Sequence, residues 1–334
     1  MEFIVKDTIQ KLVEAFGPVG YEDQVRSIIR KEIAGLADQI SVSKLGSLIA
    51  FKKGAGSGKK IMLAAHMDEI GIIVTHIDKH GFVRFATLGG VVALYSIAGR
   101  VQFANGQIGV IGLEHRDDTS KSPTLDQLYI DVGATDKSSC PVHVGDVAIF
   151  HRPLESIGSR LTAKSLDDRI GCAVLIETFR RLKSTPHDIY FVFSVQEEVN
   201  SAGARTSAYS IEPDLALAVD ITGTGDTPKA LPMAVELGKG PAIKVKDVAM
   251  IADPRIKEWM IKRAEAARIP YQLEILRLGT TDAEVIQSSR DGVPSGALSI
   301  PGRYLHSASE MVDLADVENA VKLLLALISK PIDL

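Results

Sequence analysis

The chain has 334 residues, of which 46% are hydrophobic, and this is enough to bury a large core in two domains or in one domain with an insert. Because the net charge is −4 and aromatic residues make up only 5%, the composition indicates no nucleic-acid partner. No run of 18 apolar residues predicts a membrane span, and the start lacks the apolar core of a signal peptide. A cytoplasmic protein is therefore expected. The chain has two cysteines, Cys140 and Cys172, which are too few to indicate a disulfide framework.

The first third of the chain contains two different patterns. Residues 1–40 predict two helices around a glycine-rich turn, and the apolar run 61–65 predicts a strand that is buried on both faces. Between about 70 and 160, short alternating stretches rich in valine, isoleucine and glycine are separated by turn residues. This pattern predicts a small β-barrel insert at 70–160.

From residue 161 onward, strands and helices alternate along the chain. Strands are predicted at 189–195, 215–219 and 297–300, and helices at 168–183, 253–268 and 313–329. Such alternation is typical of the α/β class, with a layered, mostly parallel sheet flanked by helices. We therefore expect residues 1–69 and 161–334 to form one α/β domain that the barrel insert interrupts.

Polar side chains follow four of the predicted strands. They are, in chain order, His66 and Asp68, Glu197 and Glu198, Asp220, and His306. A further pair, Asp167 and Asp168, precedes a predicted helix. Open α/β sheets bind their ligands at the carboxyl ends of the strands. Each cluster alone is typical of a solvated turn or a helix cap, but several carboxylates buried together need cations.

Two imidazoles and three carboxylates, without a thiolate, favour zinc or cobalt, with manganese as a further choice. Two ions about 3.5–4 Å apart need a bridging carboxylate. Asp167 is assigned to the bridge because it comes from a loop between the other ligands. One ion would then be bound by His66 and Asp220, and the other by Glu198 and His306.

The remaining acidic residues are assigned other roles. Glu197 is expected to act as general base, because neighbouring residues at a strand end point in different directions. Asp68 stands two residues after His66, so it should face the same way and orient the imidazole. Asp168 is the competing candidate for the bridge and is assigned a structural role. Asp282 is interpreted either as a helix N-cap or as part of a substrate pocket.

Several motifs extend over nearly the whole chain. They are GPVGYEDQVR, AAHMDEIG, LYIDVGA with VHVGD, LTAKSLDDRIGC, FSVQEEV, LAVD, GTTDA and IPGRYLHSASEMVDLADVENAVKLL. Together they resemble the tetrahedral-type metallo-aminopeptidases, which include glutamyl and deblocking aminopeptidases and FrvX-type proteins. The resemblance implies the same metal ligands, Glu197 as base, Asp68 beside the ligands, and a cis peptide bond after Asp167. It also implies two zinc or cobalt ions, short peptide substrates trimmed from the N-terminus, and a PDZ-like insert that assembles dimers and then twelve-subunit shells.

The chain departs from this family in one loop near the proposed base. Asn200, Ser201 and Ala202 stand where the family usually has glycine, a bulky residue and arginine. Other functions remain open at this point: a carboxypeptidase or deacylase on the same metal core, a glycosidase, or an inactive peptide-binding relative. The β insert favours the aminopeptidase. A glycosidase would instead need two carboxyl groups across a sugar, usually with aromatic platforms.

Overall fold

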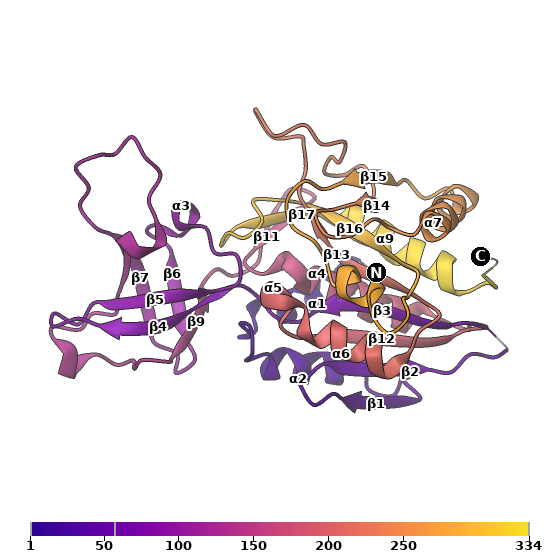
Figure 1. Ribbon diagram of the computed structural model, residues 1–334, viewed down its shortest axis with the longest axis horizontal. Helices are drawn as coiled ribbons and strands as arrows, with labels where there is room; N and C mark the ends of the chain where they lie inside the picture. Colours follow the sequence, from indigo (N-terminus) through magenta and orange to yellow (C-terminus); the bar gives the residue numbers. More distant parts are fainter. Residues whose placement is uncertain (1, 57, 333–334) are drawn as a thin grey trace.

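The computed structural model describes residues 2–56 and 58–332 and has two lobes, a layered α/β body and a barrel beside it (Figure 1). The body contains an 11-stranded sheet. Its main path is β1 (Gln39–Val42), β2 (Leu48–Lys52), β12 (Asp188–Ser194), β3 (Lys60–His66), β13 (Leu215–Thr222), β16 (Ser295–Arg303), β17 (Glu310–Asp313), β11 (Arg160–Ala163) and β10 (Glu155–Ile157). Two more strands, β14 (Ala242–Lys246) and β15 (Gln272–Ile275), join through β16.

The centre of this sheet is parallel. Strand β3 pairs in parallel with β12 and β13, and β13 pairs in parallel with β16, whereas the outer strands β1, β2, β17, β11 and β10 are antiparallel. Apolar residues of β3 alternate between two cores, with Ile61 and Leu63 on one face and Met62 on the other. The α/β class is therefore confirmed, and the continuous apolar run has the predicted cause, a strand covered on both faces.

Helices cover both faces of the sheet. On one face lie α1 (Glu2–Glu14), α2 (Asp23–Glu32), α4 (Leu166–Arg181), α7 (Pro254–Ala267) and α9 (Leu314–Ile328). The other face carries α6 (Ala202–Ile211) and α8 (Ala283–Gln287), and the one-turn helix α5 (Glu197–Asn200) follows β12. The predicted helices are confirmed as α1, α2, α4, α7 and α9. None of the described helices is long and apolar enough to cross a membrane.

Helix α6 has no counterpart among the predicted elements. Its sequence is rich in alanine and serine, so it has few of the large apolar side chains that mark a helical face. The small residues allow close packing instead: a Cβ atom on Gly203 would lie 2.5 Å from the backbone nitrogen of Val195. The close approach to Val195, the residue after β12, therefore explains the glycine at position 203.

The predicted barrel is confirmed as a closed six-stranded antiparallel sheet. Its strands are, in spatial order, β4 (Gly71–Ile77), β5 (Val83–Leu88), β8 (Leu128–Asp131), β7 (Ile108–Leu113), β6 (Arg100–Phe103) and β9 (Val147–Phe150). A short helix, α3 (Ala93–Ser96), and two single-turn 3₁₀ helices, Leu125–Gln127 and Lys137–Ser139, complete the lobe. The barrel encloses its own hydrophobic core, separate from the cores of the body.

A buried charge cluster connects the N-terminal region to the strand that carries His66. The Arg169 side chain is fully buried and donates hydrogen bonds to the backbone carbonyls of Met67 and Leu12, at 2.6 and 2.5 Å. It also pairs with Glu69 at 3.1 Å, and Lys164 pairs with the same carboxylate at 2.8 Å. Burial lowers the pKa of Lys164 to about 8.

Replacing Arg169 by methionine should destabilise the fold by about 3–5 kcal/mol, because it leaves buried carbonyls without a donor and removes one of the two cations that pair with Glu69. Urea unfolding measures this change. Arg255→Met is the control, since that arginine pairs with Asp253 at the surface and its loss should leave the midpoint near wild type. Equal midpoints for the two variants would contradict this account of the cluster.

Candidate metal centre

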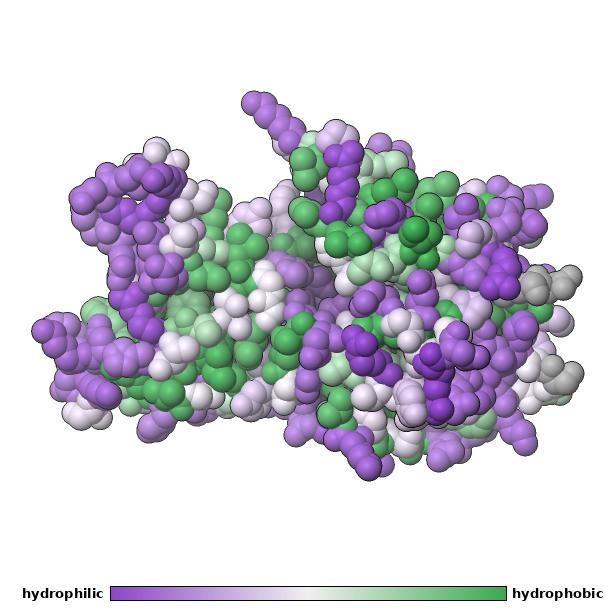
Figure 2. Space-filling view, in the orientation of Figure 1, coloured by the Kyte–Doolittle hydropathy of each residue, from purple (hydrophilic) through white to green (hydrophobic). Residues whose placement is uncertain are grey.

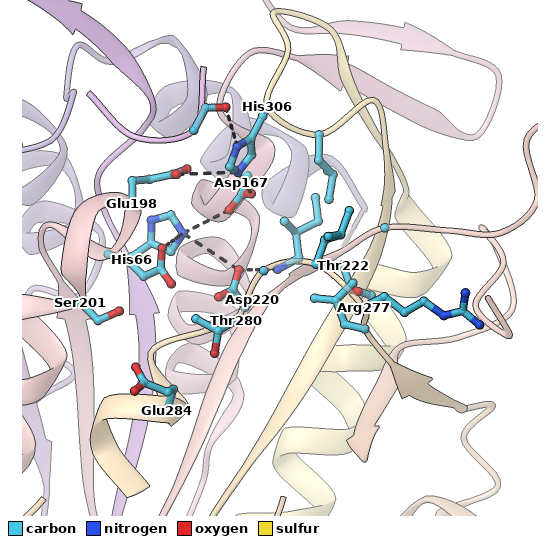
Figure 3. Close-up of a pocket in the computed structure, with 18 of the residues that line it drawn as sticks. His66, Asp167, Glu198, Ser201, Asp220, Thr222, Arg277, Thr280, Glu284 and His306 are labelled. Carbon is cyan, nitrogen blue, oxygen red and sulfur yellow. Dashed lines mark hydrogen bonds and ion pairs between the residues drawn. The ribbon is translucent and has the colours of Figure 1, made fainter. Parts of the chain in front are cut away.

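Four strands end at one edge of the sheet and bring the predicted polar residues together (Figure 3). His66 is the last residue of β3, and Asp220 lies near the end of β13. Glu198 lies on α5, directly after β12, and His306 lies in the loop from β16 to β17. In Figure 3 these side chains converge around Asp167, which comes from the start of α4. The sheet edge therefore gathers two imidazoles and three carboxylates, as the sequence predicts.

Asp167 lies between the two histidines. Its Oδ1 is 3.1 Å from His66 Nε2, and its Oδ2 is 3.5 Å from His306 Nε2. The same ring nitrogens also face the other two carboxylates: Asp220 Oδ1 is 4.0 Å from His66 Nε2, and Glu198 Oε2 is 3.7 Å from His306 Nε2. One carboxylate thus faces two separate imidazole–carboxylate pairs, an arrangement that suits a bridge between two cations.

Asp168 uses its carboxylate differently from Asp167. Its Oδ2 accepts the backbone N–H of His66 at 3.1 Å, and its Oδ1 accepts that of Gly171 at 3.0 Å. A carboxylate oxygen of Asp168, a ring nitrogen of His66 and a carboxylate oxygen of Asp220 lie within 4.8 Å of one another. The same holds for His66, Asp167 and Glu198, so proximity alone does not separate the two aspartates. The peptide bond between Asp167 and Asp168 is cis, as the family resemblance implies.

Hydrogen bonds fix the orientation of both imidazoles. His306 Nδ1 lies 2.9 Å from the carbonyl oxygen of Gly90, and His66 Nδ1 lies 3.1 Å from the carbonyl oxygen of Asp68. A ring nitrogen that donates to a carbonyl leaves the other, Nε2, free to bind a cation. In both rings Nε2 is the atom that faces Asp167.

The Asp68 carboxylate has a different main contact from the one expected. Its closest approach to the His66 ring is 3.6 Å, longer than a hydrogen bond. Its two oxygens instead accept the backbone N–H groups of Glu197 and Glu198, at 3.0 and 3.1 Å. Asp68 is fully buried. Through these two hydrogen bonds it fixes the backbone at the start of α5, which carries both glutamates.

Glu197 borders both the cluster and the cavity in front of it. Its Oε2 is 3.9 Å from His66 Nε2, farther away than the Asp167 oxygen at 3.1 Å. Its side chain lines the cavity in front of the cluster. A carboxylate in this place can exchange protons with a molecule in the cavity.

Two residues that support the cluster were not found from the sequence. Gly90 lies in the segment after β5, and a Cβ atom there would lie 2.5 Å from His306 Nδ1, so only glycine allows this approach. Glu310 accepts backbone hydrogen bonds from Asp167 and His306. The one available signal for Glu310 was its position four residues after His306. Asp282 occupies the N-cap position of α8 without a capping hydrogen bond, and its carboxylate instead accepts a hydrogen bond from the Ser194 hydroxyl. It is not among the residues that line the cavity.

The buried carboxylates lack cationic side chains to balance them. Among the described residues, the acids of the cluster form ion pairs only with His66 and His306. Burial, followed by the charge of Asp167, raises the pKa of Glu198 to about 7 and that of Asp220 to about 8. The Asp167 carboxylate, which faces the ring nitrogen of His306, raises the pKa of His306 to about 10. Bound cations would remove this excess of negative charge, so the donor set fits divalent metal ions.

The metal-free protein should lose stability as the pH rises. Since the pKa values of Glu198 and Asp220 are raised on folding, the folded protein holds these protons more tightly than the unfolded chain does. That stabilisation is lost as the pH passes through about 7 and about 8. We expect the melting temperature of chelator-treated protein to fall between about pH 6 and pH 8, and that of zinc-loaded protein to stay level. Calorimetry in matched buffers measures both, and a chelated protein that melts higher at pH 8 would contradict the charge balance described here.

A cavity of about 760 Å³ opens in front of the cluster. Much of its lining is apolar, including Ile221, Leu276 and Leu305. Asn200 and Ser201, which depart from the family pattern, also line it, whereas Ala202 does not. The cavity is large enough for the end of a peptide beside the cluster.

Comparison with known proteins agrees with this geometry. The profile described as M42 glutamyl aminopeptidase matches residues 46–323. A putative aminopeptidase of Acetivibrio thermocellus is 47% identical over 95% of this chain and 96% of its own length. The solved aminopeptidase of the archaeon Desulfurococcus kamchatkensis has a TM-score of 0.94 at 39% identity, over 98% of this chain and 95% of that one.

A further solved relative is the TET1 peptidase of Pyrococcus horikoshii, which can assemble into a tetrahedron or a large octahedral shell. Its TM-score is 0.87 at 31% identity, over 98% of this chain and 99% of that one. These matches confirm the aminopeptidase prediction. The chain belongs to the M42 glutamyl aminopeptidase family and is a metallo-aminopeptidase.

Proposed function

We propose that this protein binds two divalent metal ions and removes N-terminal residues from short peptides. His66 and Asp220 would bind one ion, Glu198 and His306 the other, and Asp167 would bridge them. The observation that supports this division most directly is the placement of Asp167, whose two oxygens face different imidazoles. Imidazole and carboxylate ligands suit zinc or cobalt, with manganese as a third choice.

Bound metal ions supply Lewis acidity to the peptide carbonyl and lower the pKa of an attacking water molecule. Glu197 would accept a proton from that water and deliver it to the leaving amine. Its position beside the ligand cluster, with its side chain in the cavity, supports this role. Asp68 would keep Glu197 and Glu198 in place through their backbone N–H groups.

The two lobes would have different functions. Residues 1–69 and 161–334 would form the catalytic domain, and 70–160 would form an assembly domain. The barrel encloses a separate core, yet it exposes large apolar side chains at Val92, Leu94 and Tyr95. Figure 2 shows hydrophobic surface on this lobe. Such surface is typical of an interface between subunits. The solved relative PhTET1-12s is described as a dodecamer, and we expect a twelve-subunit shell assembled from dimers here as well.

Blocked peptides test which end of the substrate is recognised. A tripeptide with a free N-terminus should lose its first residue, and amidation of its C-terminus should have little effect. Acetylation of its N-terminus should abolish cleavage. Release of the C-terminal residue, or removal of the acetyl group, would overturn the proposed direction of cleavage. Mass spectrometry of the products distinguishes these outcomes.

A further inference from the structure

We propose that Glu310 is a positioning residue that sets the spacing between Asp167 and His306, and this inference rests on the two-ion site proposed above. Glu310 is the first residue of β17 and is 2% exposed. Strand β17 lies between β11, which leads toward Asp167, and β16, which leads toward His306. The carboxylate is therefore placed where the two ligand-bearing segments meet.

Each oxygen of this carboxylate has one partner, and each partner is a proposed ligand. Oε2 accepts the backbone N–H of Asp167, and Oε1 accepts the backbone N–H of His306, both at 2.9 Å. Glu310 forms no ion pair with any lysine, arginine or histidine that the structure describes. A buried carboxylate without a cationic partner is costly. Its contacts connect it to the metal centre rather than to the packing of the core.

The two ligands that Glu310 holds lie outside the strands of the central sheet, as does Glu198 on α5. His66 and Asp220 lie within β3 and β13, whose parallel pairing fixes their backbone. His306 lies in a loop and has a φ of 58°, and Asp167 has non-helical dihedral angles at the start of α4. Loss of Glu310 should therefore weaken the ion bound by Glu198 and His306 more than the ion bound by His66 and Asp220.

A matched pair of variants separates this role from general stability. Glu310→Gln keeps the shape of the side chain, but its amide group presents a donor to one of the two N–H groups. The control is Asp316→Asn in α9. Asp316 is fully buried, and its oxygens accept the backbone N–H groups of Gly238 and Gly240, both at 2.7 Å. It has the same chemistry as Glu310, without contact to a proposed ligand.

Cobalt titration of metal-free protein, followed by calorimetry and by cobalt absorption, gives the result. Wild type should bind two equivalents per subunit. In Glu310→Gln one of the two Kd values, assigned to the ion bound by Glu198 and His306, should rise by about 10- to 100-fold. The Kd of the other ion should stay within about threefold of wild type. Asp316→Asn should lower the melting temperature yet keep both Kd values within about threefold of wild type.

Three results would overturn the inference, and they are distinguishable. Wild-type affinities in Glu310→Gln, or equal loss in both variants, would remove Glu310 from its positioning role while leaving the proposed function intact. Fewer than two equivalents in wild type would overturn the proposed function itself. If Glu310→Gln does not fold, amide hydrogen exchange in the wild-type apoprotein tests whether Glu310 holds the two ligand segments. The amides of Asp167 and His306 should exchange more slowly than that of Ala308, and equal rates would contradict the proposal.

Discussion

Replacing Glu197 by glutamine should lower kcat by about 10²- to 10⁴-fold while leaving the metal content unchanged. Glutamine has nearly the same shape but cannot accept and return a proton at neutral pH. Glu197 is proposed as the base and not as a metal ligand, so its loss should not release an ion. Steady-state hydrolysis of aminoacyl anilides measures kcat, and elemental analysis measures the metal.

Two comparisons make this prediction selective. Glu258→Gln, an exposed substitution on α7, should have wild-type kcat and metal content. Glu198→Gln should lose metal together with activity, because that residue is assigned to an ion. If Glu197→Gln turned over substrate at the wild-type rate, Glu197 would have no part in proton transfer. If the Glu197→Gln variant lost an ion, Glu197 would be a metal ligand instead of the base.

The adjacent aspartates should respond differently to the same change. Asp167→Asn should reduce the bound metal to fewer than two ions and lower activity by about 10³-fold, because the two ions supply several kcal/mol of charge stabilisation. Asp168→Asn removes one of two hydrogen bonds to buried backbone N–H groups. It should cost about 1–3 kcal/mol of folding free energy and retain two ions.

Metal analysis and thermal unfolding of both variants, run side by side, separate the two roles. Loss of an ion in Asp168→Asn, with two ions retained in Asp167→Asn, would reverse the assignment of the bridge. The distances favour Asp167, whose oxygens face the imidazoles directly, whereas those of Asp168 are already used by the backbone.

The parts of the site on the central strands were predictable from the sequence. His66 and Asp220 follow or end apolar runs, and parallel strands bring such ends to one edge. The α/β class and the barrel were predictable for a related reason, since the period of the apolar residues changes near residues 70 and 160. Burial on two faces leaves a continuous apolar pattern, and burial on one face leaves an alternating pattern.

The supporting contacts were not predictable, because they depend on backbone groups of distant segments. Gly90 contributes a carbonyl oxygen and the absence of a side chain to the His306 ring. Glu310 and Asp68 bind backbone N–H groups rather than side chains. Any residue type offers such groups, so no pattern of side chains marks the partners.

Metal reconstitution tests the central claim most directly. The protein is stripped with a chelator, then titrated with zinc, cobalt or manganese while hydrolysis of a panel of aminoacyl anilides is measured. The two-ion site predicts that activity is absent without metal and reaches its plateau at two equivalents per subunit with at least one of these metals. Full activity in the stripped protein, a plateau at one equivalent, or no hydrolysis with any metal and any amino acid would contradict it.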